Sequence, residues 1–309
     1  MSGKEGRKNF PGGVLLFDKP EGMTSHDAVN LARRVFGTRQ AGHTGTLDPM
    51  ASGLLQILVG RAVKASDYLS KHDKKYVAGI KFGVSTDTGD ATGKVLNEGG
   101  RIPSFEELCA ALPGMTGNLM QIPPMYSAVK VGGMKLYDLA RRGLSVEREP
   151  RPVTVYSLSA DKTADPSVFR LDVECSSGTY IRVLCEDLAA RLGTVAVMSS
   201  LRRTSVGRFV IDEAVTRERL ESFAGSDPDK LLIPVEQAFS DYLELCLEPF
   251  YEKLIRDGCR PFAAKVGLSR AKPGDRYRLL SHSGEFFSLG EIAESENGNV
   301  LKSLVLFTL

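Results

Sequence analysis

The sequence AGHTGTLDPMASGLL, residues 41–55, says more about fold and function than any other stretch of this chain. It sets one carboxylate, Asp48, in a loop that is punctuated by three glycines and flanked by apolar residues. Glycine permits close backbone approaches that a side chain would block, and Pro49 biases Asp48 toward an extended conformation. A carboxylate held on such a shaped loop is suited to covalent attack. Spacing alone fits a solvated aspartate beside a turn proline at least as well.

Segments of strand and helix pattern surround this loop. Short apolar runs and apolar alternation predict strands over residues 14–17, 54–59, 76–82, 153–158 and 169–175. Helical spacing predicts a helix capped by Ser25, a helix over 61–70, a helix with a Ser104–Glu107 capping box, a basic helix that ends at Arg142 and a helix over 181–192. Residues 86–93 predict a surface turn, and residues 121–135 predict an extended loop. Because strands and helices do not alternate strictly, we expect an α+β fold with flanking helices around a mixed, mainly antiparallel central sheet.

The C-terminal third differs from the rest. Residues 228–234 begin and end with proline and lie in an acidic section, which indicates a linker zone. Beyond it, strand patterns over 276–280 and 286–289, joined by Ser283-Gly284, predict a small β-rich module. We therefore expect a mobile leader over residues 1–12, a large domain over 13–240 and a small domain over 241–309.

Five further motifs flank the loop in a fixed order: KPEGMTS at 19–25, KKY at 74–76, QIPPMYSA at 121–128, GTYIR at 178–182 and LRR at 201–203. Together with residues 41–55 they resemble the motifs of the TruB family of tRNA pseudouridine synthases, in which the aspartate of G-H-T-G-x-L-D-P is the nucleophile. The resemblance is strong over residues 13–210 and weak beyond, with mild departures at Met50 and Ser52. It implies a pseudouridine synthase fold followed by a PUA-like C-terminal domain.

The resemblance also implies a reaction. Pseudouridine forms when the N-glycosidic bond of uridine breaks, the base turns and a bond to carbon replaces the bond to nitrogen. Nothing is oxidised or imported, so we expect no cofactor and no metal. The resemblance makes Asp48 the nucleophile, whether it attacks the base, attacks the sugar or abstracts a sugar proton. Arg182 is the candidate cation that keeps Asp48 ionised in a partly dry pocket, although a phosphate contact or a surface charge would also fit its spacing.

Four residues are candidates for holding the RNA. Tyr76 offers a ring that can stack on a flipped uracil and a phenol for the later removal of a proton from carbon. The resemblance makes Tyr180 and Leu201 walls of the uracil pocket, and His43 can fill the gap that the flipped base leaves in the RNA stack. Three of these could instead be core residues, and His43 a turn or capping residue. Lys19 is expected to be mainly structural.

Charge is unevenly distributed along the 309 residues. The net charge is +2, but residues 1–210 carry 28 Lys and Arg against 21 Asp and Glu, whereas residues 211–309 carry 12 against 17. The motifs therefore lie in the positive part, which suits a partner with a phosphate backbone. Eight basic residues between Lys253 and Arg278 either form a second RNA contact or balance the acidic stretch 212–244.

Composition limits the remaining possibilities. With 42% apolar and 25% charged residues, the chain is not a disordered one. Its five cysteines include no C-x-x-C pair and its four histidines are scattered, so we predict neither a disulfide framework nor a metal site. No apolar signal core or membrane-length run is present, and we expect a cytoplasmic protein without a membrane partner.

The resemblance to the TruB family implies a tRNA pseudouridine synthase that isomerises uridine 55 in the T-arm (TΨC) loop. We expect it to act on tRNA as a monomer without a protein partner. One alternative is a tRNA-binding or tRNA-folding module in which Asp48 is idle. The other is a guide-RNA-dependent pseudouridine synthase, against which the short leader and small tail argue.

Overall fold

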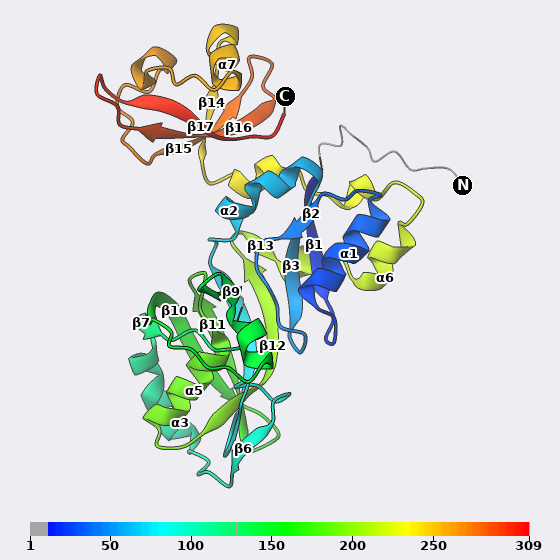
Figure 1. The fold of residues 1–309 in the computed structure, drawn as a ribbon, viewed down its shortest axis with the longest axis vertical. Helices are drawn as coiled ribbons and strands as arrows, with labels where there is room; N and C mark the ends of the chain where they lie inside the picture. Colours follow the sequence, from blue (N-terminus) through cyan, green and yellow to red (C-terminus); the bar gives the residue numbers. More distant parts are fainter. Residues whose placement is uncertain (1–11, 128, 309) are drawn as a thin grey trace.

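The computed structural model describes residues 12–127 and 129–308 (Figure 1). Within them the central sheet consists of β1 (Gly13–Lys19), β2 (Ala41–His43), β3 (Ser52–Val59), β4 (Lys74–Phe82), β7 (Gly117–Gln121), β10 (Arg151–Lys162), β11 (Val168–Cys175), β12 (Ala196–Val206) and β13 (Phe209–Val210). The main path runs β1, β3, β12, β4, β11, β10, β7, with β2 on β3 and β13 on β12. Neighbours pair antiparallel except β3 and β12, which pair parallel. The predicted mixed, mainly antiparallel sheet is confirmed.

Helices lie at both ends of this sheet. They are α1 (Ser25–Val35), α2 (Ser66–Leu69), α3 (Phe105–Ala111), α4 (Leu136–Arg141), α5 (Ile181–Arg191) and α6 (Arg217–Ser222). Figure 1 shows α1 and α6 beside β1 and β3, whereas α3 and α5 lie toward β10 and β11. The apolar faces of α1 and α5 bury in one core with the sheet. Two small hairpins, β5 (Val84–Thr86) with β6 (Val95–Glu98) and β8 (Lys130–Val131) with β9 (Met134–Lys135), extend from this body.

The start of α1 differs from the prediction and matters for the site. Thr24, not Ser25, is the N-cap: its side chain accepts a bond from the Asp27 amide, and the Asp27 carboxylate accepts one from the Thr24 amide at 3.1 Å. Ser25 is released from capping and bonds to the 41–55 loop instead. Its hydroxyl accepts from the Leu47 amide at 2.8 Å and donates to the Leu47 carbonyl at 3.0 Å.

A second sheet follows near the C-terminus. It runs β14 (Leu243–Cys246), β15 (Arg276–Leu280), β16 (Phe286–Ala293), β17 (Val300–Leu306), with α7 (Pro249–Arg256) beside it. This confirms the predicted small β-rich module. The module shares a buried apolar cluster with the back of β1 and β3, to which it contributes Phe286, Leu289 and Phe307. Lys64, in the 3-10 helix Gly60–Ala65 that follows β3, also donates to the Leu306 carbonyl of β17 at 2.8 Å, so a polar contact holds the module as well.

Two local predictions are wrong, and a third is confirmed with a difference in helix type. Residues 228–234 are no free linker, because Ile233 and Val14 exchange two backbone hydrogen bonds of 2.8 and 2.9 Å. The helix expected over 61–70 is confirmed as a helical stretch, which consists of a 3-10 helix, Gly60–Ala65, followed by the four-residue α2. The turn at 86–93 is not a surface turn throughout, since Thr86 and Asp90 are buried.

Two expectations concern the limits of the chain and its parts. The leader expected over residues 1–12 lies outside the described residues except for Gly12. The division at residues 240 and 241 remains a prediction. Of the helices in the described ranges, none is long and apolar enough to cross a membrane.

Candidate active site

The loop that carries Asp48 is fixed from several sides. The two bonds between Ser25 and Leu47 tie it to α1, and the Gly22 amide donates to the Pro49 carbonyl at 2.8 Å. Leu47 itself is buried in the main core. The loop therefore presents Asp48 on a rigid frame, and the aspartate side chain keeps 33% of its surface exposed.

Arg182 reaches Asp48 from the start of α5. Its Nη2 lies 3.1 Å from Asp48 Oδ2, and its side chain is only 6% exposed. The same guanidinium donates to the Thr88 carbonyl at 2.9 Å and to the Tyr126 carbonyl at 2.8 Å. These bonds fix the orientation of the cation, because a planar guanidinium held at three edges cannot rotate freely. The structure thus pairs the two residues that sequence analysis selected as nucleophile and counter-charge.

A second carboxylate, which sequence analysis missed, shares this arginine. Asp90 Oδ2 lies 3.9 Å from Arg182 Nε, and the Asp90 side chain is 7% exposed. Its other oxygen accepts bonds from the hydroxyls of Thr88 at 2.9 Å and Thr92 at 2.6 Å. No signal in the DTGDATG turn marked one of its aspartates as buried, because such turns are usually solvated.

These surroundings act on the ionisation of Asp48 in opposite directions. Burial raises the pKa of the Asp48 carboxyl above its ordinary value, the Arg182 charge lowers it, and the Asp90 charge raises it. Burial dominates, so the net direction is upward. Arg182 is therefore the main group that favours the ionised, nucleophilic form.

Tyr76 lies on β4, directly between Val173 of β11 and Arg203 of β12. The residue is 9% exposed, and Asp48 is close enough to influence its phenol electrostatically. Burial raises the pKa of the Tyr76 phenol, and a hydrogen bond and the charge of Arg203 oppose that rise. The phenol is consequently protonated at neutral pH.

The two other candidate pocket residues lie on neighbouring elements. Leu201 is on β12 opposite Ala78, is 7% exposed and belongs to the same core cluster as Tyr76. Tyr180 is the N-cap of α5, and its main chain exchanges two bonds of 2.9 and 3.3 Å with the Gln121 side chain. These two bonds fix the backbone position from which the Tyr180 side chain extends. The residue is half-buried.

His43 ends β2 on the opposite side of the loop. Its side chain is half-buried, and Nδ1 is buried with no hydrogen-bond partner among the described residues. Burial lowers the pKa of the imidazole, and the charge of Arg203 lowers it further. The ring is therefore neutral at physiological pH.

Three buried cations lie close to these residues, namely Lys19, Lys74 and Arg203. Sequence analysis assigned none of them to the chemistry. Lys19 is 0% exposed and donates to the carbonyls of Pro20 at 2.9 Å and Met23 at 2.8 Å, which supports its structural role. Burial and the charge of Arg203 lower the pKa of Lys19 to about 8 and that of Lys74 to about 8. The frame under the site is thus rich in positive charge.

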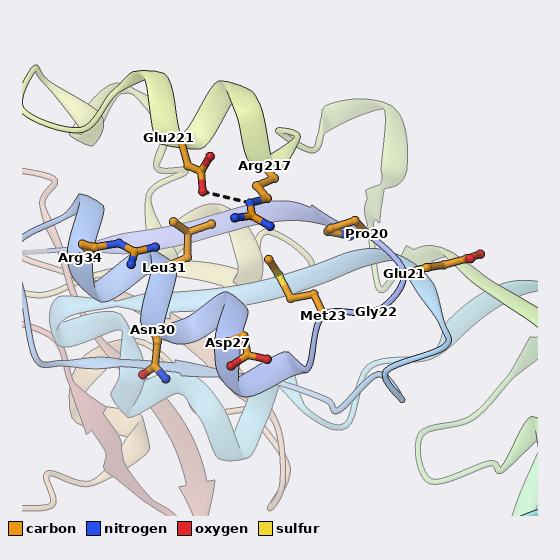
Figure 2. A pocket seen from close by; sticks show the side chains of 10 residues that line it. All are labelled: Pro20, Glu21, Gly22, Met23, Asp27, Asn30, Leu31, Arg34, Arg217 and Glu221. Carbon is orange, nitrogen blue, oxygen red and sulfur yellow. Dashed lines mark hydrogen bonds and ion pairs between the residues drawn. The ribbon is translucent and has the colours of Figure 1, made fainter. Parts of the chain in front are cut away.

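A separate groove of about 570 Å³ opens behind the loop, between α1 and α6 (Figure 2). Arg217 and Glu221 form an ion pair of 3.0 Å on its α6 side, drawn as a dashed line in Figure 2. Gly22 and Met23 form part of its lining, and the same two residues brace the Asp48 loop and Lys19. Asp48 does not line this groove, which is therefore distinct from the Asp48 site.

The site has the parts for nucleophilic chemistry on a planar base. A carboxylate paired with a fixed guanidinium lies near the buried Tyr76 phenol, which belongs to the main apolar core. Nowhere in the described part of the chain do three or more His, Cys, Asp or Glu side chains converge as metal ligands would.

Comparison with solved structures identifies the fold. A structure described as "Crystal Structure of a Cbf5-Nop10-Gar1 Complex" matches with a TM-score of 0.70 at 23% identity, over 96% of this chain and 85% of the other. A second, "Structure of H/ACA RNP bound to a substrate RNA containing 2'-deoxyuridine", matches with a TM-score of 0.70 at 20% identity, over 97% and 86%. The central sheet and the C-terminal module of this chain therefore share the overall fold of these two structures.

Sequence comparison then identifies the family. Residues 33–181 match the description "TruB family pseudouridylate synthase (N terminal domain)", and residues 182–240 match "tRNA pseudouridylate synthase B C-terminal domain". A protein named tRNA pseudouridine synthase B from Neisseria meningitidis serogroup B is 39% identical over 92% of this chain and 91% of its own length. One of the same name from Aromatoleum aromaticum is 44% identical over 83% of each chain. This chain belongs to the TruB family.

Proposed function

We propose that this protein is a tRNA pseudouridine synthase that converts uridine 55 in the T-arm loop of tRNA to pseudouridine. The observation that carries the proposal is the Asp48–Arg182 pair of 3.1 Å, held on a rigid loop with the carboxylate partly open to solvent. Membership of the TruB family and the names of its relatives supply the reaction and the substrate. The enzyme is an isomerase, since the product has the atoms of the substrate.

The target nucleotide must leave its stack to reach Asp48. Unstacking one base costs a few kcal/mol, and a planar group that enters the gap offsets part of that cost. His43, neutral and at the edge of the loop, is the residue that takes the place of the base. Tyr76 then stacks on the extruded uracil, and Tyr180 and Leu201 form the walls that keep it in place after the glycosidic bond breaks.

Asp48 acts in its ionised form. Arg182 favours that form before reaction and stays with the carboxylate as charge moves to the substrate. When the uracil has turned and C5 has joined C1′, the proton on C5 must depart. The protonated Tyr76 phenol can relay it: its oxygen accepts the C5 proton while its own hydrogen passes to a base, either water or the Asp48 carboxylate that has been released from the substrate. The reaction balances without an oxidant or an imported group, and we propose that the enzyme uses no cofactor.

The remaining parts of the proposal concern its context. We propose that the protein acts on tRNA in the cytoplasm as a monomer, with no protein partner. We further propose that residues 13–240 carry the reaction and that residues 241–309 form the PUA-like domain. The docked C-terminal sheet supports a fixed arrangement of the two.

Isomerisation of unmodified tRNA tests this function. Wild type should form pseudouridine at position 55, as mapped chemically, with no guide RNA or second protein added. Asp48→Asn should lower the single-turnover rate at least about a thousandfold while it retains RNA affinity. Asp172→Asn is the matched control, because this aspartate is a surface partner of Arg170.

The two alternatives give different results in the same assay. A tRNA-folding module would keep its full effect on tRNA in Asp48→Asn and would form no pseudouridine in wild type. A guide-dependent synthase would be inactive on bare tRNA and would become active only with guide RNA and accessory proteins.

A further inference from the structure

Arg203 occupies the strand that joins the two halves of the site. In the sheet, β12 lies between β3 and β4, and Arg203 stands opposite Gly53 of β3 and Tyr76 of β4. The approach to β3 is very close: a Cβ added at Gly53 would lie 2.3 Å from the Arg203 carbonyl oxygen. Since Gly53 also has a φ of +102°, only glycine fits there without strain. The backbone of Arg203 is therefore clamped in place.

The Arg203 side chain extends from this clamp to both catalytic elements. Its Nε donates to the Leu54 carbonyl at 2.7 Å, and its Nη2 donates to the Gly45 carbonyl, in the Asp48 loop, at 3.1 Å. Tyr76 stands directly opposite Arg203 across β4 and β12. Burial raises the pKa of the Tyr76 phenol, and the guanidinium lies close enough to oppose that rise through its charge and through hydrogen bonding. One side chain thus links the loop of the nucleophile to the phenol.

The surroundings of Arg203 make its charge unfavourable for the free energy of the folded protein. The residue is 2% exposed, and its partners in the described part of the chain are two carbonyls and a phenol, none of them a carboxylate. Its charge makes the nearby Lys19 and Lys74 harder to protonate. A buried guanidinium without an anionic partner loses hydration that hydrogen bonds only partly replace. Folding alone gives little reason for an arginine here.

The adjacent arginine shows the ordinary arrangement. Arg202 has a side chain that is 43% exposed, and it forms a two-pronged pair of 2.8 and 3.1 Å with Asp18. Arg202 also donates to the Ser52 hydroxyl at 3.4 Å, at the start of β3, and none of its bonds goes to Tyr76 or to Gly45. Arg202 is therefore an ordinary structural arginine, whereas the side chain of Arg203 is directed toward the site.

We propose that Arg203 is a positioning residue for the isomerisation, which fixes the Tyr76 hydroxyl relative to the Asp48 loop. The inference rests on the proposed function. A guanidinium can only donate hydrogen bonds, so the Tyr76 oxygen accepts from it and the phenolic hydrogen points away from Arg203. Arg203 therefore selects one orientation of the phenol, and it acts on the reaction through Tyr76 rather than through contact with RNA.

Single-turnover isomerisation of tRNA tests the proposal with four variants. Arg203→Lys should lower the rate about 10- to 100-fold, with RNA affinity within about threefold of wild type, since misplacement of a catalytic group acts on rate more than on binding. Arg202→Gln is the control and should change the rate less than about threefold. Tyr76→Phe removes the hydroxyl. When Arg203→Lys is added to Tyr76→Phe, the rate should fall by less than about a further threefold.

Each other outcome overturns the proposal. If Arg203→Lys costs the same factor with and without the Tyr76 hydroxyl, Arg203 does not act through the phenol. If affinity falls as much as rate, Arg203 is an RNA contact. An inactive wild type would instead sink the proposed function itself.

Folding is monitored by thermal melting in parallel. Should Arg203→Lys fail to fold, Gly53→Ala offers a second route, because its methyl group displaces the Arg203 backbone and leaves the guanidinium intact. It should lower the rate in wild type and have little further effect in Tyr76→Phe. An equal loss in both backgrounds would contradict the proposal.

Discussion

Buried cations have different partners in the central sheet and in the C-terminal module. In the module each half-buried arginine faces glutamate: Arg256 pairs with Glu252 at 2.8 Å, Arg276 with Glu291 at 3.0 Å, and Arg278 with Glu236 and Glu244. Around Asp48, three cations are almost fully buried and their hydrogen bonds go mainly to carbonyls. These are Lys19, Lys74 and Arg203.

This difference distinguishes a scaffold from a reactive site. Charges that are paired within the protein stabilise its structure, and their electrostatic potentials largely cancel at the position of a ligand. A cluster with surplus positive charge raises the free energy of the folded protein, and it favours anions that come close, such as the Asp48 carboxylate or an RNA phosphate. The module is therefore expected to matter for stability and the central cluster for chemistry.

Among the cations of these two regions, the largest effect is expected from Arg182, the cation that is shared by two carboxylates. Arg182→Met should lower kcat about 100- to 1,000-fold, because Asp48 loses its counter-charge and its ionised form becomes less favourable. The active form is the carboxylate, so activity falls as pH drops through the pKa of Asp48. Burial already raises that pKa and Arg182 opposes the rise, so the variant should move the acid limb of the pH–rate profile to higher pH.

The pH dependence separates this effect from simple damage. Arg170→Met serves as the control, because Arg170 pairs with Asp172 at 2.8 Å on the surface and should leave the profile unchanged. A lower plateau with an unmoved acid limb in Arg182→Met would show that Arg182 does not tune Asp48.

The next effect concerns stability. Phe307 of the module is 4% exposed and packs on Phe239 and Phe286, with ring centroids 6.1 and 5.3 Å away. Phe307→Ala should lower the free energy of unfolding by about 3–5 kcal/mol, measured by denaturant titration. Phe262→Ala, at a site that is 44% exposed, should cost less than about 1 kcal/mol.

This variant also tests whether the two regions form one unit. Because the apolar cluster is shared with the back of β1 and β3, we expect the catalytic activity and the module to be lost in a single transition. Removal of the module near Leu247 should for the same reason destabilise the catalytic part. Retention of full activity after the module has melted would mean that the two regions are independent.

The sequence predicted the elements whose patterns are local. The alternation of Phe169, Leu171, Val173 and Cys175 gave β11, and the Ser104–Glu107 capping box gave the start of α3. It also gave the candidate Asp48–Arg182 pair, although that came from motif resemblance, since no spacing rule brings residues 48 and 182 together.

What the sequence missed depends on long-range packing. β12 lies in the middle of the sheet, yet its Ser-Ser-Leu-Arg-Arg-Thr-Ser stretch shows no apolar alternation because its polar side chains serve the site and its neighbours. Asp90 and Arg203 were missed for the same reason. A buried charge looks like a surface charge until the elements that cover it are placed.

A smaller effect tests the cost of the cationic cluster. The pKa of Lys74 is lowered to about 8 from 10.5, so between these values the unfolded chain binds a proton that the folded protein does not. Stability of wild type should therefore rise with pH across this window, by at most about 3 kcal/mol from this group. In Lys74→Met that contribution is absent, so the wild type should gain stability relative to the variant from pH 8 to 10.5.

The adjacent lysine provides the control for that measurement. Lys75 has a side chain that is 56% exposed and pairs with Glu174 at 3.2 Å. The stability difference between Lys75→Met and wild type should not change over the same pH range. If the stability difference between Lys74→Met and wild type were also independent of pH, burial of Lys74 would not destabilise the folded protein.

The smallest effect concerns the exposed cations of the module. Arg256, Arg276 and Arg278 are occupied by glutamates, which leaves Lys253, Arg260, Lys265, Arg270 and Lys272 exposed. If this surface contacts RNA, Lys265→Glu with Arg270→Glu should weaken the affinity for whole tRNA about three- to tenfold and reduce its dependence on salt. Lys230→Glu is the control in the acidic section, where the lysine is 74% exposed beside Asp227.

Substrate length decides where the contact lies. Under the proposed function the Asp48 site contacts only the T arm, so the double variant should bind an isolated T-arm hairpin as well as wild type does and lose affinity only for whole tRNA. Equal losses on both RNAs would indicate a general effect of charge, since a long-range field does not depend on contact. No loss on either RNA would leave these cations as a balance for residues 212–244, and the module would then differ from the central cluster in having no RNA contact through this surface.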